Sequence, residues 1–207
     1  MAEVTRDARA AVTDYAKYID TGMKLLFPGE HIKKNAAAAL AVADILGIDV
    51  DGAKRSLANF RGTWRRFEYK GTMKNGALLY DDYGHHPTEI EATVSAMREA
   101  FPEKKITLVF QPHLFSRTKE HLVNFGKALA KADRVILAPI YAAREKPDSS
   151  ISSHDVVVEV KKYNPHALYL ETFEDIADEL DTNSSSKDVI ITMGAGDIYK
   201  VANVPLD

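Results

Sequence analysis

The residue types best suited to acid–base or anion chemistry lie in four short polar segments of the sequence. They are Asp81–Pro87 (DDYGHHP), Gln111–Thr118 (QPHLFSRT), Tyr141–Lys146 (YAAREK) and Gly194–Asp197 (GAGD). Two adjacent histidines beside two carboxylates, just before an expected helix start, can hold an anion, pair with a carboxylate or relay a proton. The simpler alternative is a loop in which Gly84 turns the chain, Pro87 begins the helix, and both histidines cap it or face water.

Arg117 and the Gly194-Ala195-Gly196 turn are further candidates for anion binding. Arg117 falls in the first turn of an expected helix, where the helix dipole disfavours a cation, so a ligand carboxylate or phosphate is the favoured partner. The alternative is an exposed arginine paired with Glu120 or Glu91. The glycine turn lets backbone amides approach an anion, but it serves equally as a plain tight turn because it lacks the third glycine of the dinucleotide fingerprint.

The sequence does not favour a metal centre or a phosphate-binding loop of the P-loop kind. Adjacent histidines rarely reach one ion together, and no HxxxH spacing accompanies DDYGHHP, so we predict no metal ligands. The pattern GxxxxGK[ST] does not occur, the nearest match being Gly126-Lys127-Ala128 inside an expected helix. A complete nucleoside-triphosphate site of that kind is therefore not encoded in these 207 residues.

The composition narrows the classes of partner. The chain carries 27 Lys+Arg against 30 Asp+Glu, a formal net charge of −3, whereas nucleic-acid binders usually show a basic excess. It has no cysteine, which excludes disulfides and thiolate chemistry and fits a reducing compartment. No apolar run approaches the roughly 20 residues of a membrane span. We expect a cytoplasmic protein with no nucleic-acid or membrane partner.

The elements that must position these residues alternate as in a parallel sheet covered by helices. Continuous runs rich in β-branched residues, such as ITLVF, RVILA and VIITM, are typical of strands buried on both faces. We predict strands at Leu78–Asp81, Ile106–Phe110, Arg134–Ala138, Ala167–Leu170 and Val189–Met193, and helices starting near Pro87, Ser116, Ser152, Thr172 and Ala195. The fold class is α/β, a Rossmann-like, mostly parallel sheet with helices on both faces, preceded by a short helical segment. Ligands in such sheets bind beyond the carboxyl ends of the strands, where all four polar segments fall.

The first 60 residues do not join this alternation. They predict two helices, Asn35–Leu46 and Val50–Phe60, separated by a turn at Gly47–Asp49. The segment NAAAALAVADIL is apolar almost all round, so it needs partners on more than one side. It either packs on the sheet or is the end of a neighbouring domain. Asn35 at the expected start of this helix is a helix cap or a ligand contact.

The four polar segments resemble the last domain of the Mur ligase family. The resemblance rests on YDDYGHHPTEIEAT (80–93), FQPHLFSRT (110–118), YAAREK (141–146) and TMGAGDIYKVA (192–202), in this order and spacing. Upstream, PGEHIKKNAAAALAVA (28–43) is similar to the end of the central ATPase domain, and the WRRF segment (64–67) resembles the entrance to the last domain. DDYGHHPTE resembles the alanine-adding members rather than the tripeptide-recycling ones.

The resemblance implies that residues 1–62 are a helical remnant of the central ATP-binding domain and that 63–207 form the C-terminal domain. It implies an ATP-dependent ligase of peptidoglycan synthesis, which joins L-alanine to the lactyl carboxylate of UDP-N-acetylmuramate through an acyl phosphate that the alanine amine attacks. ATP and Mg2+ belong to the full-length enzyme, and neither site is complete in this chain. UDP-N-acetylmuramate would bind through other domains. On this interpretation the chain alone is inactive.

The resemblance also assigns nucleotide contacts to single residues. Asn35 matches an asparagine that contacts adenine, Arg66 an arginine that reaches the ATP phosphates or ribose, and Asp82 an aspartate on the ribose. An amide, a guanidinium and a carboxylate suit these partners chemically. Ile32 stands where many relatives have another asparagine, which leaves the adenine contact to Asn35.

His85, His86, His113 and Arg117 match positions near the reacting centre and the amino acid. The resemblance implies charge recognition by Arg117, and polarisation or proton transfer by one of the histidines, without deciding which. Leu114 occupies a position that is arginine in some relatives, so a carboxylate contact made there is lost while Arg117 remains.

Two other functions are compatible with the residues. A free-standing α/β module could use the same polar edge to bind a nucleotide or another anion without catalysis. A hydrolase could be built on the histidines and aspartates of DDYGHH, and it would lose phosphatase or esterase activity in His85→Ala and His86→Ala variants.

Overall fold

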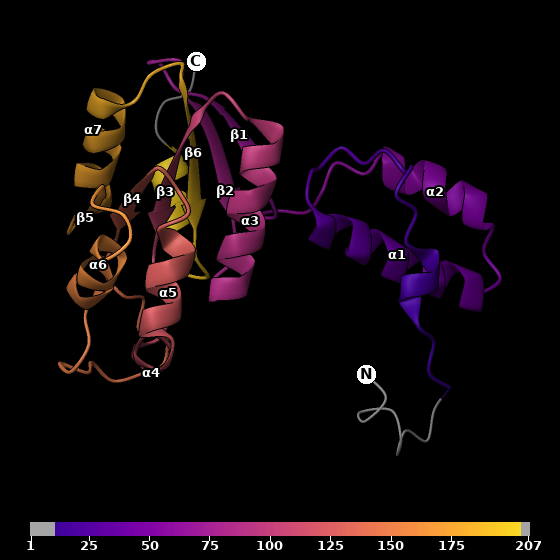
Figure 1. The fold of residues 1–207 in the computed structure, drawn as a ribbon, viewed down its shortest axis with the longest axis horizontal. Helices are drawn as coiled ribbons and strands as arrows, with labels where there is room; N and C mark the ends of the chain where they lie inside the picture. Colours follow the sequence, from indigo (N-terminus) through magenta and orange to yellow (C-terminus); the bar gives the residue numbers. More distant parts are fainter. Residues whose placement is uncertain (1–10, 204–207) are drawn as a thin grey trace. The chain divides into compact units, whose positions relative to one another are not determined.

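The computed structural model describes residues 11–203, and the chain divides into two compact units, Met1–Arg61 and Gly62–Asp207 (Figure 1). The first unit holds a short 3₁₀ helix, η1 (Tyr15–Tyr18), and the helices α1 (Glu30–Ile45) and α2 (Val50–Ala58). The Asp49 carboxylate accepts hydrogen bonds from two backbone N–H groups of α2 and caps that helix. Alanines and Leu40 line the buried face of α1.

The helix α1 begins five residues before the expected start, with Gly29 as its N-cap. Asn35 therefore lies inside α1, and the prediction that it opens or caps this helix is wrong. Its side chain is exposed within the described part of the chain.

The second unit is built on a six-stranded sheet of order β1-β2-β6-β3-β4-β5. The strands are β1 (Glu68–Thr72), β2 (Leu78–Asp82), β3 (Lys105–Phe110), β4 (Arg134–Leu137), β5 (Ala167–Tyr169) and β6 (Asp188–Met193). All neighbours are parallel except β1, which pairs antiparallel with β2. The last strand, β6, lies between β2 and β3, in the interior of the sheet. These pairings confirm the predicted α/β class and its mostly parallel sheet.

Helices cover both faces of the sheet. The helices α3 (Pro87–Ala100), α5 (Leu122–Leu129) and α6 (Ser153–Lys161) lie side by side (Figure 1), with the short α4 (Phe115–Glu120) preceding α5. On the other face, α7 (Phe173–Asn183) and the 3₁₀ helix η2 (Ile198–Asn203) share a buried apolar cluster with the strands. Strand side chains such as Val109, Ile136 and Ile190 belong to that cluster and are fully buried, as expected for strands covered twice.

The structure departs from the expected elements in three places. The strand β1 was not predicted, because its sequence EYKGT is half-exposed and interrupted at Gly71, where the pairing with β2 shifts register. The helix expected near Ser116 does begin there, at Phe115, but it already ends at Glu120, so that α4 and α5 are separate helices. The helix expected near Ala195 is the 3₁₀ helix η2, which begins at Ile198.

The expected starts at Pro87, Ser152 and Thr172 are confirmed. Pro87 is the first residue of α3, whereas Ser152 and Thr172 are the N-caps of α6 and α7. The Thr172 hydroxyl accepts from the Asp175 backbone N–H at 3.0 Å, which is the capping interaction that the sequence suggests.

Candidate functional site

The loops after β2, β3, β4 and β6 meet at the carboxyl edge of the sheet. Because β6 lies between β2 and β3, the DDYGHHP, QPHLFSRT and GAGD segments follow three neighbouring strands. The chain after β3 leads to α4 and α5, whereas the chain after β6 leads to η2, which packs with α7 on the opposite face. Such a divergence of adjacent connections is where open α/β sheets bind ligands.

His85, His113 and Arg117 form one polar cluster at this edge. The rings of His85 and His113 have centroids 5.7 Å apart, and an Arg117 guanidinium nitrogen lies 3.2 Å from His113 Nδ1. The His113 ring also stacks on Tyr141, which follows β4, at 5.7 Å. Three of the predicted site residues, from two loops, are therefore brought together, and Arg117 pairs with neither Glu120 nor Glu91 among the described contacts.

The charge state of His113 follows from its neighbours. Partial burial lowers the pKa of His113 below its ordinary value, and the Arg117 guanidinium and His85 lower it further, against a small opposing effect of Glu145. With Arg117 as donor, His113 Nδ1 acts as the acceptor, which requires a neutral ring. The cluster thus presents a neutral imidazole beside a permanent cation.

The two adjacent histidines have different surroundings. His86 is the N-cap of α3: its Nδ1 accepts from the Thr88 N–H at 3.3 Å, and its ring lies against His121. The Glu89 carboxylate accepts from the backbone N–H groups of both His85 and His86, which closes a capping box. The simpler alternative, in which the histidines cap the helix, therefore holds for His86, whereas His85 belongs to the polar cluster.

Asp82 braces the same loop. Its two carboxylate oxygens accept from the backbone N–H groups of Phe67 at 2.8 Å and Gly84 at 2.7 Å, and its residue is only 7% exposed. Burial raises the pKa of Asp82, although these two hydrogen bonds and Arg66 act in the opposite direction. The structure thus gives Asp82 a loop-holding role, and its predicted ribose contact would have to use the remaining lone pairs.

The residue that sequence reasoning missed is Arg65. Its guanidinium is 2% exposed and forms a 2.7 Å ion pair with Asp81, and it donates to the carbonyl oxygens of Gly194 at 2.6 Å and Gly196 at 3.0 Å. The second Asp81 oxygen accepts from the Thr192 hydroxyl at 2.6 Å. The signal available in the sequence was the doubled arginine of WRRF matching the doubled aspartate of DDYGHHP.

The two glycines after β6 are required by close packing. A Cβ on Gly196 would lie 2.5 Å from the Gln111 amide oxygen and 2.6 Å from Tyr141 Cγ. Gly194 has φ +146°, and a Cβ added to it would lie 2.7 Å from the Gln111 carbonyl oxygen. Since their carbonyl groups also accept from Arg65, these glycines belong to a packed turn, which is the plainer of the two interpretations.

The short helix α4 is held by residues distant in the sequence. The Glu145 carboxylate of the YAAREK loop accepts from both the backbone N–H and the hydroxyl of Ser116. The residue before α4, Leu114, has φ +71° although it is not glycine. Backbone strain of this kind is maintained only where the surroundings enforce it, and it is concentrated at functional sites.

The remaining predicted contacts are dispersed. Arg66 is exposed, and its guanidinium lies 5.5 Å from the centre of the Tyr83 ring. Asn35 belongs to the first unit, so its adenine contact stays a prediction. Among the residues described, 11–203, no group of three or more His, Asp or Glu side chains is placed to hold a metal ion, and no helix is long and apolar enough to cross a membrane.

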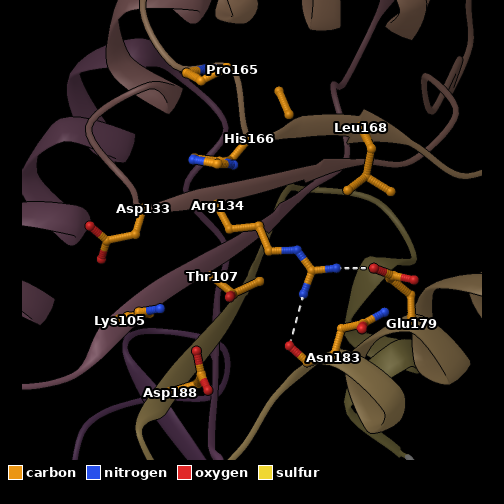
Figure 2. Close-up of a pocket in the computed structure, with 11 residues that line it drawn as sticks. Lys105, Thr107, Asp133, Arg134, Pro165, His166, Leu168, Glu179, Asn183 and Asp188 are labelled. Atoms are coloured by element: carbon orange, nitrogen blue, oxygen red, sulfur yellow. Dashed lines mark hydrogen bonds and ion pairs between the residues drawn. The ribbon is translucent and has the colours of Figure 1, made fainter.

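A hollow of about 600 Å³ opens at the opposite, amino edge of the sheet (Figure 2). Arg134 points into it and forms an ion pair with Glu179 and a 3.4 Å hydrogen bond to the Asn183 carbonyl oxygen. Lys105, Asp133 and Asp188 add charges of both signs. None of the predicted site residues lines this hollow.

The comparison with known proteins decides the family. The description "Mur ligase, glutamate ligase domain" matches residues 65–196, a span that contains the first three polar segments and all of the fourth except Asp197. The chain belongs to the Mur ligase family. Relatives of this Mur ligase chain include UDP-N-acetylmuramate--L-alanine ligase of Lachnospira eligens, 48% identical over 84% of the chain, and that of Caldanaerobacter subterraneus, 44% identical over 86%. The chain spans 38% of the length of each relative.

Solved structures agree with the family. UDP-N-acetylmuramate-alanine ligase MurC from Thermotoga maritima is 30% identical, with a TM-score of 0.71 over 86% of this chain and 37% of that one. The MurF ligase of Thermotoga maritima, solved with ADP, is 24% identical with a TM-score of 0.58 over 81% of this chain and 36% of that one, and it supports the fold alone. The resemblance expected from the four segments is thereby confirmed.

Proposed function

We propose that the complete protein is an ATP-dependent ligase that joins L-alanine to UDP-N-acetylmuramate in peptidoglycan synthesis. We also propose that residues 1–62 are the end of its central ATP-binding domain and 63–207 its C-terminal domain. The observation that carries the proposal is the cluster of His85, His113 and Arg117. These three motif residues come from two loops that meet at the carboxyl edge of the sheet. The relatives named as L-alanine ligases support it.

The cluster suits an amino acid with a free carboxylate and a reacting amine. Arg117 would bind the carboxylate of alanine, since a guanidinium donates two parallel hydrogen bonds to such a group. His113, held neutral by burial and by Arg117, could accept a proton from the incoming ammonium group, which must lose it before the nitrogen can attack. His85, 5.7 Å away ring to ring, would pass or stabilise that charge.

Only part of the nucleotide site comes from this chain. Arg66, which is exposed beside Tyr83, would hold a phosphate group of ATP, and Asn35 and Asp82 would contact adenine and ribose. Bound ATP would supply the phosphoryl group that activates the sugar carboxylate. On this proposal the Mg2+ that accompanies ATP belongs to the complete enzyme; among the described residues of this chain, no group of three or more His, Asp or Glu side chains is placed to hold a metal ion.

The decisive experiment uses the complete reading frame that encodes this chain. Phosphate release from ATP should require UDP-N-acetylmuramate and L-alanine together, and this chain by itself should release none. A binding module without catalysis would release none in either form. Absence of alanine-dependent release by the complete protein would refute the proposal.

An Arg117→Met variant tests whether Arg117 binds the carboxylate of alanine. Loss of a charge-assisted hydrogen bond to the carboxylate should raise the KM for alanine about tenfold to a hundredfold, while the KM for ATP stays unchanged. Arg98→Met is the matched control, because Arg98 pairs with Asp133 on the surface. An unchanged KM for alanine in Arg117→Met would remove this residue from the site.

A further inference from the structure

Arg65 connects three parts of the carboxyl edge. Its side chain reaches Asp81 at the end of β2 and the carbonyl groups of Gly194 and Gly196 after β6. Its backbone carbonyl oxygen accepts from the Tyr83 N–H at 2.7 Å, which holds the start of the histidine loop. The loops after β2 and β6 thus share one partner, at the place where the second unit begins.

The backbone around Arg65 is held in an unusual conformation. Arg65 has φ +55° and Phe67 has φ +50°, which side-chain-bearing residues seldom adopt. Each of these two residues is fixed by one of the adjacent aspartates: Asp81 binds the Arg65 guanidinium, and Asp82 binds the Phe67 N–H. Both flanking residues are buried, at 2% and 3% exposure, and Arg66 between them is exposed.

We propose that Arg65 is a positioning residue: it fixes the loops after β2 and β6 to the segment that presents Arg66, so that the histidine cluster and the nucleotide contact keep one relative arrangement. It touches none of the groups assigned to chemistry and acts through Asp81, Tyr83 and the glycine carbonyls. Only the expected effect of Arg65 on turnover rests on the proposed function.

The chemistry of the site requires a guanidinium. Nε donates to Asp81, while the two terminal nitrogens donate to two separate carbonyl groups, so that all three nitrogens are used. A lysine ammonium has no such planar fork and could keep the ion pair only by abandoning the carbonyl groups. Rings of Trp64, Tyr83 and Tyr199 surround the guanidinium at 4.8 to 5.8 Å and add cation–π attraction.

Amide hydrogen exchange on the 207-residue chain tests this role. In Arg65→Lys, loss of a charge-assisted hydrogen bond should speed exchange at Tyr83 and Gly194 by about tenfold or more, with little change at the buried amides of α6. The matched control is Arg134→Lys at the amino edge, whose arginine also pairs with a carboxylate and a backbone carbonyl. It should leave Tyr83 and Gly194 unchanged.

Thr192→Val covers the case in which Arg65→Lys does not fold. It removes only the hydroxyl that donates to the second Asp81 oxygen, and it should give the same local pattern with a smaller increase. Two results would overturn the proposal: unchanged exchange at Tyr83 and Gly194 in the folded variants, or exchange that rises equally at every amide. Either result would mean that Arg65 does not specifically fix the loops after β2 and β6.

The same variants in the complete enzyme separate this inference from the proposed function. Arg65→Lys should lower kcat about tenfold or more, since the misplaced loops carry the reacting groups, and Arg134→Lys should not. An unchanged kcat in an active enzyme would refute the positioning role. If the complete protein does not ligate alanine at all, the proposed function fails while the exchange experiment still decides whether Arg65 fixes the loops.

Discussion

Replacing Asp81 by asparagine removes the negative charge that neutralises a fully enclosed arginine. The side chains of Asp81 and Arg65 are 1% and 2% exposed, and Arg65 Nε lies 2.7 Å from the Asp81 carboxylate. Asp81→Asn keeps the size of the side chain, but its single amide oxygen can accept from either Arg65 or Thr192, so that the change removes the charge together with one acceptor. The guanidinium of Arg65 then stays buried without a counter-ion.

Breaking a buried pair by removing one partner typically lowers the free energy of unfolding by about 3–5 kcal/mol. Arg65 keeps its two carbonyl acceptors, so we expect a loss of about 3 kcal/mol, at the lower end of that range. For a unit of roughly 150 residues this corresponds to a fall in Tm of about 6–12 °C. Urea unfolding followed by far-UV circular dichroism measures the loss directly, with the slope m checked for constancy.

Glu91→Gln is the matched control for the charge removal. Glu91 pairs with Lys131 at 3.0 Å, but the two side chains are 42% and 50% exposed, and such surface pairs contribute about 0–1 kcal/mol. If Asp81→Asn destabilises the chain no more than Glu91→Gln does, the Arg65–Asp81 pair does not hold the carboxyl edge together, and the reasoning above is wrong.

Three further changes test separate parts of the site. Burial and Arg117 hold the pKa of His113 below its unfolded value of about 6.5, so that protonation of His113 lowers the free energy of unfolding as pH falls through that value. Arg117→Met should raise the pKa of His113, measured by NMR titration, and should reduce this loss of stability. Gly196→Ala should cost about 1–3 kcal/mol in urea unfolding, because its Cβ meets the Gln111 amide at 2.5 Å. His86→Ala should cost about 1 kcal/mol by removing the cap of α3, and His86→Asn should restore most of it; equal stabilities would exclude the capping role.

The sheet was predictable where burial on both faces leaves a continuous apolar run. β3, β4 and β6 were found on that basis, and so were the helix starts that carry their own caps. The strand β1 was missed because an edge strand with an exposed side and a glycine has no such pattern. The start of α4 near Ser116 was predicted, but the contact that holds its first turn was not, because that contact comes from Glu145, 29 residues away from Ser116 in the sequence.

The candidate site was predictable as a set of loops, but not residue by residue. The sequence contains doubled residues at Arg65-Arg66, Asp81-Asp82 and His85-His86, and composition alone cannot say which member of a pair turns inward. That choice depends on backbone conformation, such as the positive φ of Arg65, and on partners far along the chain such as Gly194. The predictions chose Arg66 and Asp82 and left the histidines undecided, whereas the structure separates His85 from His86.

The position of β6 determines the order in which this unit can assemble. It is the last of the six strands in the sequence but lies between β2 and β3, so that the sheet stays in two halves until residue 193 is available. Likewise, Arg65 cannot form its hydrogen bonds to Gly194 and Gly196 until the chain has grown by a further 129 and 131 residues. Such distant pairings close late and slowly. During synthesis on the ribosome, therefore, β2 and β3 carry unpaired edges until the final strand emerges, and this interval is when the chain is most exposed to aggregation.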